Sequence, residues 1–365
     1  MADALRPASE AEAADLIRGA EAPLRIVGGG TRFIGDTAGT PVDTSGMAGI
    51  VLHDPGALTL VARAGTALAE IEAALAAERQ MLAFEPPDFR GLLGRGGVST
   101  IGGVVAANAS GPRRISGGAA RDSLIGVRFV DGSGMVVKNG GRVMKNVTGL
   151  DLARLMAGAR GTLGLLTEVA FRVLPQPEQV ATLVLPVAEP GQAVAVMAAA
   201  MASPFDVTGA AWAGGEVLLR IEGFAASVAY RCDALRQRLG LAGAIEPGAA
   251  RWPKVRDVAA FQGHEGDVWR LSVKPSDAPG IIAKAGADVV MLDWAGGLIW
   301  LLVEPGIDLR ARIGAFGGHA TRMRGDSAGI ATFHPEPAPV ARLTAGLKAR
   351  FDPKGLLNPG LLGQS

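Results

Sequence analysis

Three glycine-rich segments contain the residues best suited to hold a ligand. The first comprises Gly28, Gly29, Gly30 and Thr31, and it directly follows a predicted buried strand, Leu24–Val27. A glycine turn after a strand exposes several backbone N–H groups with no side chain in the way, and such groups bind anions, above all phosphate. Thr31 adds a hydroxyl group. The same residues could also form a tight turn that binds nothing, and this segment alone leaves both interpretations open.

The second segment, residues 96–111, is rich in small residues and hydroxyl groups and carries almost no charge. It includes Gly102, Gly103, Asn108 and Ser110. This composition suits a backbone that packs closely against a planar ligand and its diphosphate, although a buried, tightly packed turn would have the same composition. A third small-residue turn spans residues 161–164, with Gly161 and Gly164 at its ends. Three such turns in one half of the chain indicate a long ligand that is held at several points.

Several common motifs are missing from these segments. In the first, the third glycine of the dinucleotide fingerprint G-x-G-x-x-G is replaced by Phe33, which argues against a standard Rossmann site. No G-K-[ST] sequence follows a glycine loop, so a P-loop is excluded. No G-x-S-x-G elbow is present either, and a serine hydrolase is therefore not supported.

Candidates for acid–base chemistry are few. Arg270 lies within an apolar strand and needs a partner, which can be a protein carboxylate or the carboxylate of a substrate. His319 and His334 lie where the second half of the chain returns toward the first. No histidine stands at metal-ligand spacing from another, so no metal site is expected. The catalytic base therefore stays unknown at this stage, with Arg270, His319 and His334 as candidates.

The overall composition excludes several classes of protein. The 365 residues carry 36 basic and 35 acidic side chains, and aromatic residues make up only 5%. Neither the charge nor the aromatic content is typical of a nucleic-acid-binding protein. The single Cys232 excludes an intrachain disulfide framework and an iron–sulfur cluster held by this chain, and it fits a reducing compartment. With no apolar stretch long enough to span a bilayer, we expect a cytoplasmic protein.

The periodicity of apolar residues predicts an α+β organisation in three parts. Ser9 and Thr66 are expected to cap helices, and Leu68, Ile71 and Leu75 share one helical face. Two prolines at 175 and 177 mark a linker. The predicted parts are residues 1–176, then a second domain at 177–335 with an antiparallel sheet and covering helices, then residues 336–365. The last part contains an amphipathic helix over residues 340–351, whose apolar side chains are Val340, Leu343 and Leu347.

These segments, taken in order over nearly the whole chain, resemble the FAD-binding domain of the vanillyl-alcohol oxidase/PCMH flavoprotein superfamily. Within it, they resemble the FAD-binding subunits of glycolate oxidases. The resemblance is carried by residues 27–31, 84–87, 100–114, 118–127, 143–152, 161–164, 347–353 and 358–360. It implies a PCMH-type FAD-binding domain of two α+β subdomains, an α+β cap domain, and a C-terminal helix that returns to the FAD domain.

The resemblance also implies the cofactor and its contacts. FAD is expected to contact Gly28, Gly29, Gly30, Thr31, Gly102, Gly103, Asn108 and Ser110, with Gly161 and Gly164 lining the same site. No histidine lies in the first glycine segment, so we expect the FAD to be bound non-covalently. The implied partners are a catalytic flavoprotein subunit and an iron–sulfur subunit, which together oxidise glycolate, and D-lactate as a further substrate, to the 2-oxo acid. Any attachment to a membrane would come through these partners.

One departure from the related enzymes bears on the role of the chain. Relatives that oxidise 2-hydroxy acids carry a His-x-x-Gly-Asp-Gly-Asn motif in the cap, whereas residues 293–300 here contain neither histidine nor asparagine. This favours a subunit that relays electrons or stabilises the complex. Two alternatives stay open: a stand-alone FAD-dependent 2-hydroxyacid dehydrogenase, and a structural subunit without catalysis.

Overall fold

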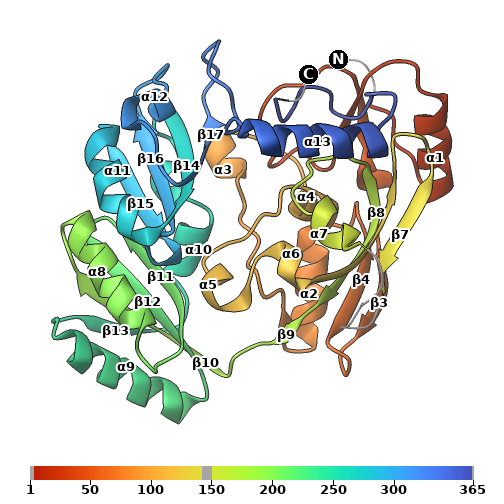
Figure 1. Ribbon diagram of the computed structural model, residues 1–365. Coiled ribbons are helices and arrows are strands. Elements are labelled where there is room, and N and C mark those ends of the chain that lie inside the picture. The colour runs from red at the N-terminus through yellow and green to blue at the C-terminus, as the bar shows by residue number, and fades with distance from the viewer. Residues whose placement is uncertain (1–3, 142–149, 364–365) are drawn as a thin grey trace.

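The computed structural model describes residues 4–141 and 150–363. The protein has two halves, each built on an antiparallel sheet, and they face one another across a common interface (Figure 1). The predicted linker at residues 175–177 begins at the last residue of the short strand β9 (Leu174–Pro175) and leads to β10 (Gln179–Pro186), the first strand of the second half. Residues 143–149 of the segment 143–152, which includes Lys145 and Asn146, lie outside the described residues.

The first half consists of a five-stranded sheet, two small two-stranded sheets and short helices. Its strands are β1 (Leu24–Val27), β2 (Thr40–Asp43), β3 (Ile50–Asp54), β4 (Thr59–Arg63), β5 (Gln80–Met81), β6 (Leu124–Val130), β7 (Val136–Gly140), β8 (Leu165–Arg172) and β9 (Leu174–Pro175). Its helices are α1 (Glu10–Gly19), α2 (Leu68–Ala77), α3 (Arg90–Leu93), α4 (Ile101–Ala106), α5 (Arg114–Gly117), α6 (Ala120–Ser123) and α7 (Leu152–Met156). The five-stranded sheet has the order β3-β4-β8-β6-β7, and β1 pairs with β2 in parallel.

The core of the first half lies between its five-stranded sheet and helices α2, α4 and α7. The predicted helical face of Leu68, Ile71 and Leu75 is buried there. Ser9 caps α1 as expected, since its hydroxyl accepts a hydrogen bond from the backbone N–H of Glu12. The expectation for Thr66 is wrong. The hydroxyl of Thr66 bonds to the backbone of Gly49 and Arg63 instead, and no side chain caps α2.

The second glycine segment contains a helix that the sequence did not predict. Helix α4 begins after Thr100, whose hydroxyl accepts a hydrogen bond from the backbone N–H of Gly103. Two glycines within six residues disfavour a helix on propensity alone. Tertiary packing outweighs that preference, because Ile101, Val104 and Val105 are all buried in the core.

The second half is a cap built on one eight-stranded antiparallel sheet. Its order is β13-β10-β12-β11-β15-β16-β14-β17. The strands are β10 (Gln179–Pro186), β11 (Val207–Ala213), β12 (Glu216–Gly223), β13 (Ala244–Pro247), β14 (Asp267–Val273), β15 (Val289–Asp293), β16 (Leu298–Val303) and β17 (Gly318–Arg324). The helices are α8 (Pro190–Met201), α9 (Ala225–Leu239), α10 (Trp252–Arg256), α11 (Ala278–Ala285) and α12 (Leu309–Ile313).

The two faces of the cap sheet have different neighbours. Helices α8, α9, α11 and α12 cover the outer face with an aliphatic core (Figure 1). The inner face carries Trp300 and Leu298 and packs toward Ile34, Phe89 and Leu92 of the first half. The inner face therefore forms one wall of the interface between the two halves.

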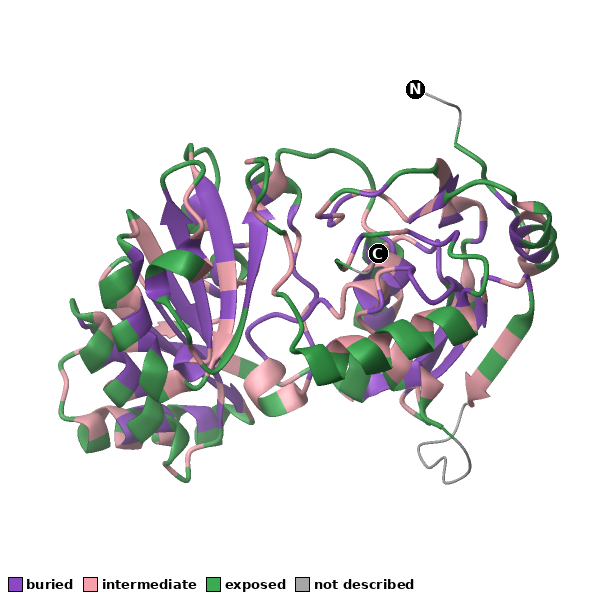
Figure 2. Ribbon diagram, turned by 45° about the horizontal axis from the view of Figure 1, so that its top comes forward, coloured by how far each residue is buried: buried purple, intermediate pink, exposed green. Residues whose placement is uncertain are grey.

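The C-terminal segment returns to the first half, although not through the surface that its sequence pattern indicates. Helix α13 (Ala338–Phe351) leaves Val340, Leu343 and Leu347 exposed, and most of the helix is coloured as exposed in Figure 2. The contact is made by Lys348, which donates a hydrogen bond to the carbonyl oxygen of Thr162, and by the ring of Phe351 against Phe129. The apolar residues Val340, Leu343 and Leu347 therefore do not attach the helix to the first half.

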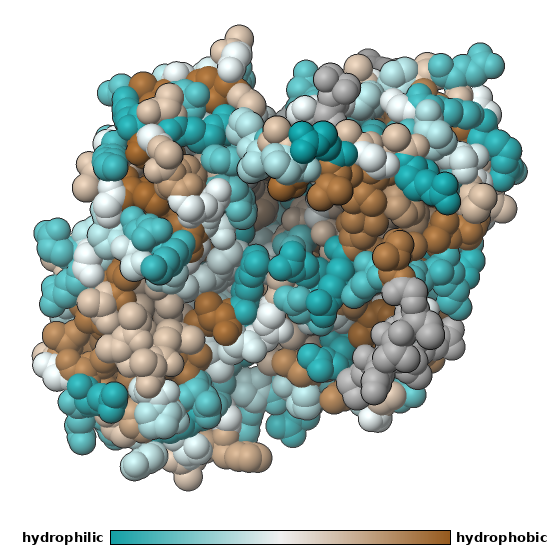
Figure 3. Space-filling model, in the orientation of Figure 1, coloured by the Kyte–Doolittle hydropathy of each residue, from teal (hydrophilic) through white to brown (hydrophobic). Residues whose placement is uncertain are grey.

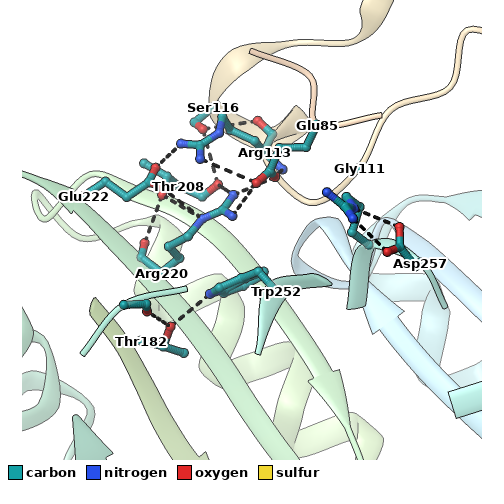
Figure 4. A network of polar contacts seen from close by, with 12 residues as sticks. Glu85, Gly111, Arg113, Ser116, Thr182, Thr208, Arg220, Glu222, Trp252 and Asp257 are labelled. Carbon is teal, nitrogen blue, oxygen red and sulfur yellow. Dashed lines mark hydrogen bonds and ion pairs between the residues drawn. The ribbon is translucent and has the colours of Figure 1, made fainter. Parts of the chain in front are cut away.

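A buried network of charges joins the two halves (Figure 4). Arg220 on the cap donates two hydrogen bonds to the carboxylate of Glu85 in the first half, at 2.7 and 2.9 Å. Glu85 also accepts a bond from the backbone N–H of Arg113, whose guanidinium pairs with Glu222 on the cap. These arginines hold the pKa of Glu85 below its usual range, although burial alone would raise it. The network fixes how the cap sits on the first half.

Candidate functional site

A first cavity lies in the first half, where the glycine-rich segments meet. Its wall contains eight of the predicted cofactor residues: Gly28, Gly29, Gly30, Thr31, Gly102, Gly103, Gly161 and Gly164. They come from three separate parts of the chain. The fold therefore brings together segments that the sequence could only suggest were neighbours.

The turn after β1 presents its backbone to this cavity. The N–H groups of Gly28, Gly29, Gly30 and Thr31 donate no hydrogen bond to any described residue. Gly30 has φ of +70°, a left-handed conformation, and a Cβ atom added to it would meet nothing within 4 Å. Consecutive free amides of this kind form an anion-binding nest. The turn has the chemistry that a diphosphate requires.

Close packing explains why glycine is needed at two of these positions. A Cβ atom on Gly29 would lie 1.4 Å from the carbonyl oxygen of Val98, and one on Gly102 would lie 2.7 Å from the Cβ of Ala64. The N–H of Gly102 bonds to the carbonyl of Ala64, and that of Gly103 bonds to Thr100. The α4 glycines therefore contribute space to the cavity, whereas free donors come from the first turn.

Arg32 lies at the junction of this cavity with a second one and lines both. Its guanidinium donates hydrogen bonds to Ser99 and to the carbonyl oxygen of Pro87. Its Nε has no hydrogen-bond partner among the described residues. Burial lowers the pKa of Arg32 to about 10, and the side chain still provides a positive charge beside the nest at neutral pH. Sequence reasoning did not single out Arg32, although it directly follows the first glycine turn.

Asn108 and Ser110 line the second cavity, and their side chains hold the loop in shape. The side-chain oxygen of Asn108 accepts a bond from the backbone N–H of Arg121, while the hydroxyl of Ser110 accepts one from Ala120. Asn108 itself has φ of +46°. In this arrangement they shape the backbone that faces the cavity.

The third glycine turn is fixed by the end of the chain. Asn358 accepts a hydrogen bond from the backbone N–H of Ile26 at 2.7 Å and donates one to the carbonyl oxygen of Arg160 at 2.7 Å. A Cβ atom on Gly161 would lie 2.9 Å from the amide nitrogen of Asn358. Asn358 thus ties the turn at Gly161 to the strand that precedes the nest.

The second cavity, of about 320 Å³, lies between the loop after α4 and the inner face of the cap sheet. Arg270 on β14 lines it, beside its partners on the two adjacent strands, Trp300 on β16 and Thr321 on β17. The sequence left open whether Arg270 pairs with a protein acid. In the described part of the chain its guanidinium forms neither an ion pair nor a hydrogen bond, and it lies over the ring of Trp294 at 5.1 Å.

The two candidate histidines are placed differently. His319 on β17 lines the second cavity, and burial together with the charge of Arg270 lowers its pKa. His334 is not among the residues that line it. The ring nitrogen Nδ1 of His334 accepts a bond from the backbone of Ala320, and the ring packs edge-on against Phe316. The structure thus favours His319 over His334 as a residue that a ligand could touch.

Asp293 is a further acid in the second cavity that the sequence analysis overlooked. It is 3% exposed at the end of β15, and one carboxylate oxygen accepts a hydrogen bond from the backbone N–H of Trp294. Burial raises its pKa to about 7. The sequence does contain a signal for a buried acid here, because Asp293 directly follows the four apolar residues 289–292.

Residues 4–141 and 150–363 contain neither a cluster of metal ligands nor a helix that could span a membrane. No group of three or more histidine, cysteine or acidic side chains there could hold a metal ion. No helix in these ranges is long and apolar enough to cross a membrane.

Comparisons with known proteins agree with the chemistry of the first cavity. Residues 2–140 match the model of an FAD binding domain. Glycolate oxidase subunit GlcE of Escherichia coli K12 is 38% identical over 342 residues, which cover 93% of this chain and 92% of that protein. Glycolate oxidase subunit GlcD of Bacillus subtilis is 40% identical over a shorter stretch, 27% of this chain and 20% of that protein.

The fold also has a solved counterpart. The structure of an alkyldihydroxyacetonephosphate synthase superposes with a TM-score of 0.70 at 16% identity, covering 97% of this chain and 76% of that one. At that identity the likeness concerns the fold alone, and it agrees with the expected α+β fold, while the FAD binding domain is shown by the match over residues 2–140. With FAD as its cofactor, the chain belongs to the family of FAD-binding oxidoreductase subunits represented by glycolate oxidase subunit GlcE.

Proposed function

We propose that this chain is the FAD-binding subunit of a glycolate oxidase complex. The complex oxidises glycolate, and D-lactate as a further 2-hydroxy acid, and passes electrons to an iron–sulfur subunit. The observation that carries the proposal is the nest of four free backbone amides at residues 28–31, in a chain that is similar over 93% of its length to GlcE. We place the complex in the cytoplasm because the single Cys232 fits a reducing compartment.

In this proposal, residues 1–176 and 336–365 hold the FAD and residues 177–335 form the cap. The amides of Gly28 to Thr31 bind the diphosphate, and Arg32 adds a positive charge beside it. Gly102 and Gly103 keep the wall free of side chains, and Gly161 and Gly164 do the same on the opposite side. When bound, FAD supplies the capacity to accept a hydride and to release its electrons singly.

Non-covalent binding is part of the proposal. No histidine lies in the first glycine turn, and Cys232 is buried in α9 on the outer face of the cap, where it cannot reach either cavity. Acid precipitation of the purified chain should therefore release all of its flavin into the supernatant. Flavin that stays with the precipitated protein would contradict this part.

An anaerobic absorption spectrum tests the proposed role. The purified chain should show oxidised flavin that bleaches with glycolate when the partner subunits are added. Bleaching in the chain alone, at the rate of the complex, would favour a stand-alone dehydrogenase. A colourless chain that cannot be reconstituted with FAD would favour a structural subunit.

A further inference from the structure

The second cavity contains three guanidinium groups that form no ion pair with an acid of the described residues. Arg114, Arg160 and Arg270 line it, and among the described residues none forms an ion pair or a side-chain hydrogen bond. Each guanidinium instead lies over an aromatic ring. The distances are 4.3 Å from Arg114 to Trp294, 4.7 Å from Arg160 to Phe333 and 5.1 Å from Arg270 to Trp294.

Such an arrangement is unfavourable unless an anion completes it. The pKa of both Arg160 and Arg270 is lowered to about 10, by burial in both cases and for Arg270 also by the neighbouring charges of Arg114 and Arg160. Removing a cation from water without a partner costs several kcal/mol. The chain supplies such partners nearby, where Arg113 and Arg220 are paired with Glu85 and Glu222 in the same interface. This contrast indicates that the guanidinium groups of Arg114, Arg160 and Arg270 bind an anionic ligand.

The cavity also offers an acceptor for a hydroxyl group. Asp293 lines it, and its second carboxylate oxygen has no hydrogen-bond partner among the described residues. Arg270 and Asp293 influence one another electrostatically, so a cationic and an acidic group lie near each other in the cavity wall. A carboxylate beside a hydroxyl group is the ligand chemistry that matches this pair.

The position of the cavity connects it with the first one. Arg32, Ala107 and Arg160 belong to the walls of both cavities, so a ligand in the second lies next to a ligand in the first. Hydrophilic side chains gather where the two halves meet (Figure 3). A small acid could therefore enter beside the cofactor without passing through the apolar cores.

We propose that this subunit has its own site for a small 2-hydroxy acid, with Arg270 binding the carboxylate and Asp293 accepting a hydrogen bond from the hydroxyl group. The site rests on the proposed function in that the neighbouring cavity holds FAD. This acid site would give the cap a role in substrate specificity. The missing His-x-x-Gly-Asp-Gly-Asn motif had indicated only a subunit that relays electrons. Arg114 and Arg160 add positive charge around the carboxylate.

The test is a binding measurement with two acids that the flavin cannot oxidise. The first is 2-hydroxyisobutyrate, which has no hydrogen on its α-carbon, and the second is isobutyrate, which lacks the hydroxyl group. Isothermal titration calorimetry on the full chain, as purified, should show tighter binding of the hydroxy acid. Arg270→Met should weaken both acids at least tenfold, and Arg270→Lys should restore part of the loss. Asp293→Ala should weaken the hydroxy acid and leave isobutyrate within twofold.

Arg172→Met is the matched control, because Arg172 is exposed at the end of β8. It should bind both acids like the wild type. Wild-type protein that binds neither acid, or Arg270→Met protein that binds both normally, would overturn the proposal. Flavin content is read separately from the absorbance at 450 nm. A chain without flavin contradicts the proposed function, whereas the calorimetry on that same sample still decides whether the acid site exists.

Discussion

The stability of the cap should depend on pH through Asp293, and Asp293→Asn should remove that dependence. Burial raises the pKa of this carboxyl group from 3.8 to about 7, while the bond from the Trp294 N–H lowers it in part. An acid whose pKa is higher in the folded state destabilises that state once the pH exceeds its unfolded pKa. The penalty grows as the pH rises and levels off above pH 7. Asparagine keeps the oxygen that Trp294 needs and never ionises.

The size of the effect follows from this shift of about three pH units, each worth about 1.36 kcal/mol. The stability gained by the variant should increase by about 2.5 kcal/mol between pH 5 and pH 8. Well below the unfolded pKa of 3.8, at about pH 2.5, the stability difference between the two proteins should no longer change with pH, because the carboxyl group is then protonated in both the folded and the unfolded state.

Urea unfolding followed by tryptophan fluorescence is a suitable assay, since all five tryptophans lie within residues 212–300, in the cap. Asp277→Asn, which removes an exposed carboxylate from the same part of the chain, is the matched control. A stability difference for Asp293→Asn that is the same at pH 5 and pH 8 would refute the reasoning.

Two other substitutions test the nest and the interface between the halves. Gly29→Ala should abolish flavin retention, because its Cβ would clash with the carbonyl oxygen of Val98, whereas a Cβ at Gly19 has open space and Gly19→Ala should retain flavin. The ratio of absorbance at 450 and 280 nm measures the flavin content of both variants. Normal flavin content in Gly29→Ala would contradict the role of the nest. Glu85→Gln leaves two buried arginines under-neutralised and should lower stability by about 3 kcal/mol. Thermal unfolding measures this loss, which should exceed that of Glu246→Gln in an exposed pair; equal losses would mean that the interface network contributes little.

Periodic apolar patterns predicted much of the fold. Strand β1 has the bounds Leu24–Val27 expected from sequence, because its apolar side chains alternate. The predicted face of Leu68, Ile71 and Leu75 is buried in α2, because these residues recur at helical spacing. Helix α4 could not be predicted in this way, since its stability comes from core contacts that bring no periodic signal through its glycines. The stripe of Val340, Leu343 and Leu347 is the opposite case, a regular pattern that the chain does not bury.

The candidate site was predictable in its backbone part and much less so in its side chains. Glycine turns indicate free backbone amides and room for a ligand to approach the backbone, so the residues of the first cavity could be predicted from sequence. Their contacts with FAD stay a prediction. Whether Arg270 pairs with an acid depends on neighbours from β16, β17 and the loop after α4, which no local pattern reveals. Asp293 was overlooked because its importance comes from burial, and burial is a property of the folded chain.

The bond between Ile26 and Asn358 joins residues that are 332 positions apart, and this separation has a consequence for how the protein is made. The strand that leads into the glycine nest cannot acquire its final partners until the ribosome has synthesised the chain as far as Asn358. Domains normally fold in order from the N-terminus during synthesis. Here the N-terminal domain gains these partners only after residues 356–358 have been synthesised, so the complete cofactor site is expected to form after the cap has been made.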